Sequence, residues 1–88
     1  MKLKAKIIKV GQYHMPSKFT APDGRVFDVP AFWDALVQFD DGDIASLKMR
    51  GIDSQSKVLV GMQAEIDVAS IVKQNGVWNI KGETILSK

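Results

Sequence analysis

The chain has 88 residues, of which 45% are hydrophobic and 25% are charged, and its formal net charge is +2. This length provides for one domain, and the composition is that of an ordinary soluble domain rather than a disordered, collagen-like or membrane-spanning chain. The absence of cysteine excludes disulfides, thiol nucleophiles and cysteine-ligated metal sites, and a small fold without these supports favours a homodimer.

The charge is unevenly distributed along the chain. Residues 1–25 contain six basic residues and one acid, whereas residues 26–45 contain five aspartates and no basic residue. The N-terminal lysines alternate with apolar residues, whereas a signal peptide separates its charge from an apolar core. No apolar run approaches the roughly 20 residues that span a bilayer. We therefore expect a cytoplasmic protein without a membrane partner.

The first half of the chain predicts three strands. Over residues 2–10 the apolar positions change parity after Ile7, which indicates a long, bent strand that continues to Tyr13 with a bulge near Gly11. Residues 14–24 contain two prolines and end in Pro-Asp-Gly, which predicts a long, mobile connector. Alternation then predicts a short edge strand over 26–29 and a longer strand over 32–39, separated by Pro30, which lacks an amide donor.

The second half predicts two hairpins. A glycine-containing turn over 40–43 leads into a strand over 44–49, and residues 51–61 predict a single helical turn capped by Asp53 or Ser54. Residues 62–72 alternate cleanly, and the Asn75-Gly76 turn leads back into a strand over 77–86. Together the elements predict an all-β fold: a small five-stranded antiparallel barrel that is OB-fold-like, with an SH3-like or Sm-like barrel as the alternative.

The sequence offers little for catalysis or metal binding. It has one histidine, His14, and a single histidine in a loop is most often solvated. The acidic run Asp40, Asp41 and Asp43 lacks the spacing and the terminal glutamate of a calcium loop. The glycines are spread one per turn rather than clustered around a phosphate. We predict no enzyme, no catalytic residue, no cofactor and no metal.

Aromatic and basic residues are the remaining candidates. Aromatic rings stack on unpaired bases, while lysine and arginine contact the phosphates, so the combination is typical of proteins that bind single strands. The alternative is that four or five of the seven aromatic residues fill the barrel, among them Phe39 and one tryptophan. Because Phe32 and Trp33 are neighbours on a strand, they must point to opposite faces.

Three features of the chain resemble the small OB-fold single-stranded DNA-binding proteins of filamentous phages. These are the basic first strand over 2–10, the Asp-Gly-Arg-Val-Phe run within residues 18–27, and the closing hairpin. The resemblance implies a homodimer that coats single strands cooperatively. It also implies that Arg25 and Phe27 lie in a strand-binding loop.

We therefore predict a non-sequence-specific single-stranded DNA-binding protein of DNA replication or of phage or plasmid DNA metabolism, with RNA as a related ligand. The alternative is a small β-barrel protein-interaction module whose aromatic residues form a subunit interface. The predicted nucleic-acid-binding residues are Lys9, Tyr13, Lys18, Phe19, Arg25, Phe27, Trp33, Lys48, Arg50, Lys73 and Trp78.

Overall fold

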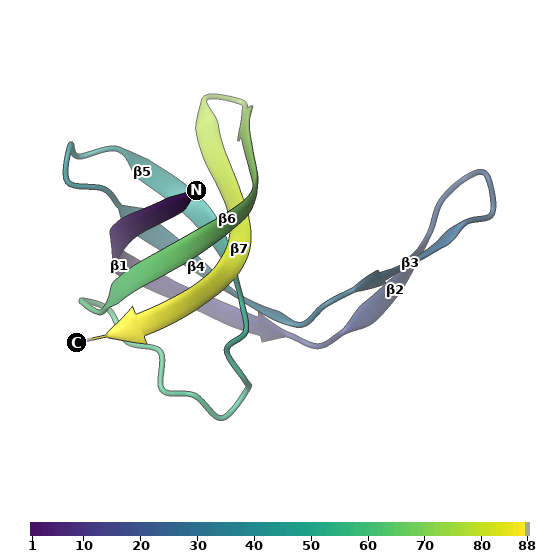
Figure 1. Cartoon of the computed structure of the whole chain (residues 1–88), viewed down its shortest axis with the longest axis horizontal. Helices are drawn as coiled ribbons and strands as arrows, with labels where there is room; N and C mark the ends of the chain where they lie inside the picture. The colour runs from purple at the N-terminus through teal and green to yellow at the C-terminus, as the bar shows by residue number, and fades with distance from the viewer. Residues whose placement is uncertain (88) are drawn as a thin grey trace.

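A barrel with a projecting two-stranded arm is the main feature of the computed structural model, which describes residues 1–87 (Figure 1). The barrel strands are β1 (Lys2–His14), β4 (Phe32–Gln38), β5 (Ile44–Arg50), β6 (Gln63–Gln74) and β7 (Val77–Ser87), in the closed order β1-β4-β5-β7-β6. The arm comprises β2 (Ser17–Thr20), β3 (Val26–Val29) and the turn between them. Within residues 1–87 there is no helix that could cross a membrane.

The predicted all-β, OB-fold-like barrel of five strands is confirmed, with one correction to the strand directions. All neighbouring strands run antiparallel except β5 and β7, which are parallel. The prediction of a wholly antiparallel barrel is therefore wrong at this pair. The reason is geometric, because strand directions can alternate all the way around a closed ring only when the number of strands is even.

The long strand β1 bends and thereby pairs with two neighbouring strands. Its first half pairs with β6, and from Lys6 onward it pairs with β4. The register shifts between Ile7 and Lys9, where the apolar positions change parity, and shifts again after Val10. A Cβ on Gly11 would lie 2.8 Å from the Cβ of Asp34, so glycine allows β1 and β4 to approach here. The predicted bend and bulge are confirmed.

Tight turns close the two predicted hairpins of the barrel. In the first, the amide of Phe39 donates to the carbonyl of Asp43 at 2.9 Å, and Gly42 has a φ of 93°. In the second, Asn75 and Gly76 both have positive φ, as a type I′ turn requires. These local backbone preferences fix the strand ends, and both predicted hairpins are confirmed.

The predicted helical turn within residues 51–61 is wrong, because this segment is an irregular loop. Asp53 nevertheless organises it: its Oδ1 accepts hydrogen bonds from the amide of Gln55 at 2.9 Å and from Oγ of Ser56 at 3.0 Å. A single helical turn fixes several residues for one hydrogen bond and is unfavourable by itself. The capping residue is therefore present without a helix to cap.

Aliphatic side chains, rather than aromatic ones, fill the barrel. Its fully buried residues are Ile7, Val37, Leu47, Met49, Ile66 and Ile80, with alanines between them. The alternative in which four or five aromatic rings fill the barrel is not observed, because none of the seven aromatic side chains, all of which lie within residues 1–87, is among the buried residues. Trp33 and Phe39 are only half-buried and pack against the core from outside it. The single buried polar side chain among residues 1–87, Thr84, donates to the carbonyl of Gly82 at 3.2 Å.

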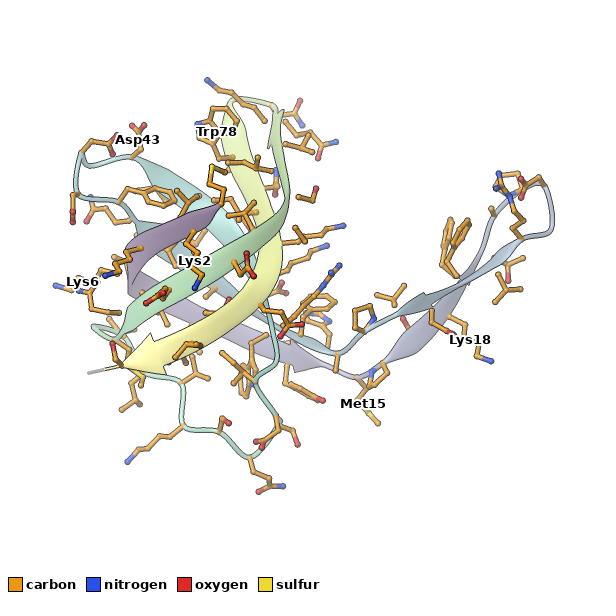
Figure 2. All side chains as sticks on the ribbon, in the orientation of Figure 1. Lys2, Lys6, Met15, Lys18, Asp43 and Trp78 are labelled. Carbon is orange, nitrogen blue, oxygen red and sulfur yellow. The ribbon has the colours of Figure 1, made fainter. Side chains whose placement is uncertain are left out.

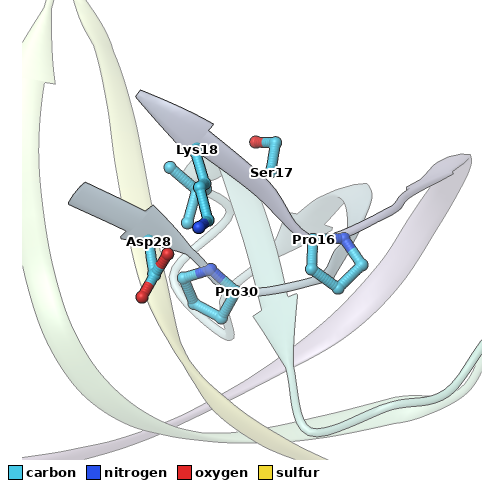
Figure 3. A pocket seen from close by; sticks show the side chains of 6 residues that line it. Pro16, Ser17, Lys18, Asp28 and Pro30 are labelled. Carbon is cyan, nitrogen blue, oxygen red and sulfur yellow. The ribbon is translucent and has the colours of Figure 1, made fainter. Parts of the chain in front are cut away.

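The arm corrects the prediction of a mobile connector over residues 14–24. That segment contains β2 and the turn to β3, in which the amide of Gly24 donates to the carbonyl of Ala21 at 2.9 Å. The register of the barrel ends at the pair His14–Phe32 and that of the arm begins at Ser17–Val29. Pro16 and Pro30 lie between these pairs and border a hollow at the root of the arm (Figure 3). Because proline has no amide donor, the two ladders separate there.

Candidate nucleic-acid interface

The outer surface of β1, β4, β5 and β7 gathers several of the predicted binding residues into what we call the sheet face. Strand register defines two rows across it. The first row runs from Lys9 through Leu36 and Ser46 to Asn79, and the second from Asp34 through Lys48 to Lys81. Arg50 follows Lys48 on the same side of β5, because side chains two residues apart on a strand share a face. The sheet face therefore carries four cations.

None of these four cations forms an ion pair within the described chain. Lys48 and Lys81 are direct neighbours across β5 and β7, and like charges in that position repel each other. Asp34 is the cross-strand neighbour of Lys48 on β4, but its carboxylate bonds to His14 instead. An anion bound between the two lysines would relieve their repulsion.

An aromatic cluster lies at the edge of the sheet face, where the arm begins. The rings of His14 and Phe32 stack with centroids 4.6 Å apart and planes 18° apart. Nζ of Lys48 lies 5.2 Å from the centroid of Phe32. Nε2 of His14 lies 2.5 Å from Oδ2 of Asp34, which fixes the imidazole over the ring. The half-buried Phe32 thus lies beside both a second ring and a cation.

Two adjoining hollows make the sheet face concave. One has a volume of about 230 Å³, and its lining includes Ser46, Lys48, Asn79 and Lys81 together with the apolar Val72 and Ile80. The other, of about 270 Å³, lies beside it and is bordered by Lys9, Gly11, Asp34, Leu36 and Ser46. Ser46 borders both hollows, and we call the two together the polar path. Hydroxyl, amide and ammonium groups along this path are all hydrogen-bond donors.

The arm carries four other predicted residues, Lys18, Phe19, Arg25 and Phe27. Phe19 and Phe27 are cross-strand partners and are 57% and 47% exposed, so the arm presents a pair of aromatic rings to solvent. The guanidinium of Arg25 lies 5.9 Å from the centroid of the Phe27 ring. Its Nε also donates to Asp23 at 2.7 Å. The backbone amide and the guanidinium of Arg25 lower the pKa of the Asp23 carboxyl.

The remaining predicted residues lie away from the sheet face. Tyr13 and Trp33 form a tilted ring pair with centroids 5.6 Å apart, and Trp33 donates from Nε1 to the carbonyl of Asp53 at 2.9 Å. This pair connects the barrel to the loop over 51–61. Lys73 and Trp78 lie on the hairpin of β6 and β7, with Nζ of Lys73 5.3 Å from the centroid of a Trp78 ring. The predicted residues thus occupy several separate places.

Sequence reasoning left several members of the sheet face out of the predicted site. They are His14, Phe32, Ser46, Asn79 and Lys81. His14 was expected to be solvated, yet it is paired with Asp34 and stacked on Phe32. Strand parity places Lys48 and Lys81 outside the barrel, but only the pairing of β5 with β7 shows that they are neighbours. The pairing of β5 with β7 joins residues far apart in the chain, and no sequence pattern indicated it.

Comparison with protein-family models, curated proteins and solved structures found no match for the chain. Within residues 1–87, no three histidine or acidic side chains converge in a way that could hold a metal ion. The case for function therefore depends on the chain's own surface.

Proposed function

We propose that the protein binds single-stranded DNA across the sheet face and along the arm, without sequence specificity. The observation that carries this proposal is the gathering of Lys9, Lys48, Arg50 and Lys81 on the sheet face, with Phe32 beside Lys48. Lysine and arginine side chains attract phosphates regardless of sequence, and release of counterions on binding provides much of the affinity.

The polar path accounts for how the backbone of a single strand would lie. Phosphates placed over Lys48 and Lys81 would be neutralised by both ammonium groups, while Ser46 and Asn79 contribute neutral hydrogen bonds. Because the path continues toward Lys9, it spans the width of β1, β4, β5 and β7. Phosphate contacts of this kind position a strand and read no bases.

The arm supplies the stacking surfaces. Phe19 and Phe27 are exposed on the same hairpin as Lys18 and Arg25, which is the combination of rings and cations that single strands require. A base stacked on an aromatic side chain contributes about 1–3 kcal/mol. Base pairs in a duplex hide the flat faces of their bases, so exposed rings favour an unpaired ligand.

The resemblance to the filamentous-phage proteins extends the proposal. A homodimer that coats single strands in the cytoplasm, during replication or phage or plasmid DNA metabolism, fits a small module of this kind. RNA is the nearest alternative ligand. A protein-interaction module that uses its exposed rings is the second candidate, favoured by the exposure of Phe19, Phe27 and Trp78.

The test is an anisotropy titration with fluorescein-labelled oligo-dT at several salt concentrations. The double variant Lys48→Gln/Lys81→Gln should reduce the slope of log affinity against log salt by about 1.4, since each phosphate contact on a single strand contributes about 0.7. The matched control is Lys4→Gln/Lys57→Gln, which makes the same charge change at exposed positions outside the two hollows.

Three outcomes decide between the candidates. The proposal requires salt-dependent binding of oligo-dT, competition by unlabelled oligo-dT but not by duplex of equal length, and a normal slope for the control. Equal binding of oligo-rU would broaden the ligand to RNA. Absence of salt-dependent binding at micromolar protein, or equal slopes for both double variants, would contradict the proposal and favour the protein-interaction module.

A further inference from the structure

Another hollow lies where the turn after β4 meets the hairpin of β6 and β7, and we call it the acidic groove. Its floor is apolar and consists of Leu3, Phe39, Ile71, Trp78 and Ile80, and Asp41 and Asp43 complete its lining. Its volume is about 260 Å³. Figure 2 labels Asp43 and Trp78 at this end of the barrel. Of these residues, only Ile80 also borders the polar path.

The floor of the groove is exposed apolar surface. Trp78 is 37% exposed and Ile71 is 41% exposed, although both are large hydrophobic side chains. Contiguous exposed apolar surface with a polar rim marks interaction sites. Tryptophan is enriched among residues that dominate binding at protein interfaces. The volume is below the roughly 300–1,000 Å³ of a drug-sized ligand site, so an anchoring side chain is a better match.

The turn holds the carboxylate of Asp41 in place and orders the backbone of Asp43. Oδ1 of Asp41 accepts a hydrogen bond from the amide of Asp43 at 3.0 Å, and the amide of Phe39 donates to the carbonyl of Asp43. Within residues 1–87, neither Asp40, Asp41 nor Asp43 forms an ion pair. Nζ of Lys73 lies 5.3 Å from the centroid of a Trp78 ring on the groove's floor, and Lys73 is not itself among the residues that line the groove. The rim therefore has an excess of negative charge.

We propose that the acidic groove binds a cationic, apolar segment of a partner polypeptide, with an aliphatic or aromatic side chain on Trp78 and lysine or arginine beside Asp41 and Asp43. Opposite charges at the rim steer such a segment and select its orientation. The two carboxylates that line the groove, Asp41 and Asp43, would repel a phosphate. This inference does not depend on the proposed DNA binding, which uses the opposite sign of charge.

A second copy of this chain fits the groove less well. Outside the groove itself, the arm offers exposed rings beside cations, with Phe19, Phe27, Lys18 and Arg25. The arm also carries Asp23 and Asp28, so its formal charge is zero, and Arg25 is already paired with Asp23. Charge complementarity therefore favours a different partner that is basic overall.

The experiment uses three labelled eight-residue peptides with the full-length protein: alternating lysine and leucine, alternating glutamate and leucine, and alternating lysine and serine. Only the lysine–leucine peptide should bind in an anisotropy titration. Trp78→Ala should weaken it about tenfold or more, and Asp41→Asn/Asp43→Asn about fivefold. The control Asp28→Asn/Asp67→Asn removes two exposed carboxylates elsewhere and should leave the affinity within about twofold.

Several results would overturn the proposal. One is failure of the lysine–leucine peptide to bind below millimolar concentration. Another is equal binding of the glutamate–leucine or lysine–serine peptide. The third is that the lysine–leucine peptide binds the groove variants and the control variant with equal affinity. Sedimentation of the protein without peptide is a further test. If the protein forms an assembly that Asp41→Asn/Asp43→Asn dissociates, a second copy occupies the groove. Circular dichroism checks that each variant is folded, and oligo-dT titration of the groove variants keeps the two proposals apart.

Discussion

The barrel and the arm are built from the same kind of strand but are stabilised in different ways. Every barrel strand pairs on both sides and contributes to a shared core in which Ile7, Leu47 and Ile66 are fully buried. In the arm, β2 and β3 pair only with each other, and seven of their eight residues are exposed. A two-stranded hairpin alone is marginally stable in water.

The overall dimensions reflect the same difference. The molecule measures 42 × 32 × 21 Å, and its radius of gyration is 13.4 Å, compared with about 12 Å for a compact chain of this length. Its accessible surface is 6105 Å², compared with about 5,100 Å² from the usual scaling with mass. The excess surface is consistent with the projecting arm in Figure 1. The buried core that stabilises the molecule therefore lies in the barrel, whereas the arm keeps its side chains exposed to solvent.

The largest expected effect is on the barrel core. Ile66→Ala should lower the free energy of unfolding by about 2–5 kcal/mol, because Ile66 is fully buried and the barrel cannot collapse around the cavity. Chemical denaturation of the variant and of the native protein measures this loss. A loss below about 1 kcal/mol would contradict the view that this core carries the stability.

A smaller loss is expected where two barrel strands approach closely. A Cβ on Gly82 would lie 2.2 Å from the carbonyl oxygen of Asp67, which belongs to the backbone of β6. Gly82→Ala should therefore cost about 1–3 kcal/mol, as overpacking usually does. Thermal unfolding monitored by circular dichroism provides the measurement. An unchanged melting temperature would mean that β6 and β7 separate there without cost.

In the arm, we expect substitutions to weaken binding rather than stability. Phe27→Ala should leave the free energy of unfolding within about 0.5 kcal/mol, since the ring contacts solvent rather than the core. It should weaken oligo-dT binding by about 5- to 150-fold, which corresponds to the loss of one stacked base. Trp33→Ala provides the contrast, because Trp33 packs on the core and bonds to Asp53, so this change should also destabilise the barrel.

The smallest expected effect is on the turn of the arm. Because the pKa of Asp23 is lowered by Arg25, the ionised carboxylate stabilises the turn. That contribution is fully present above the unfolded-state pKa and is lost as pH falls through the lowered folded-state pKa. In an NMR pH titration, the chemical shift of the Arg25 amide should change with a midpoint at a pH below 3.8, the ordinary pKa of an aspartate, while the barrel resonances stay constant. Simultaneous shifts in the barrel would show that the arm and the barrel are coupled.

Local chemistry in the sequence determined most of the strands and turns. Alternation of apolar residues predicted β4 to β7, and glycine and proline positions predicted the turns, because these preferences act over a few neighbouring residues. They failed at β2, where proline-rich turn chemistry concealed a strand. They also failed at residues 51–61, where a capping residue was present without a helix to cap.

The tertiary structure alone decided how those elements combine. A closed ring with an odd number of strands must contain a parallel pair, which here is β5 and β7. The register of this pair brings Lys48 and Lys81 together. The tertiary structure also placed Phe32 on the sheet face, Phe27 on the arm and Trp78 at the hairpin of β6 and β7. Such placements depend on contacts between residues far apart in the chain, which no local pattern of side chains encodes.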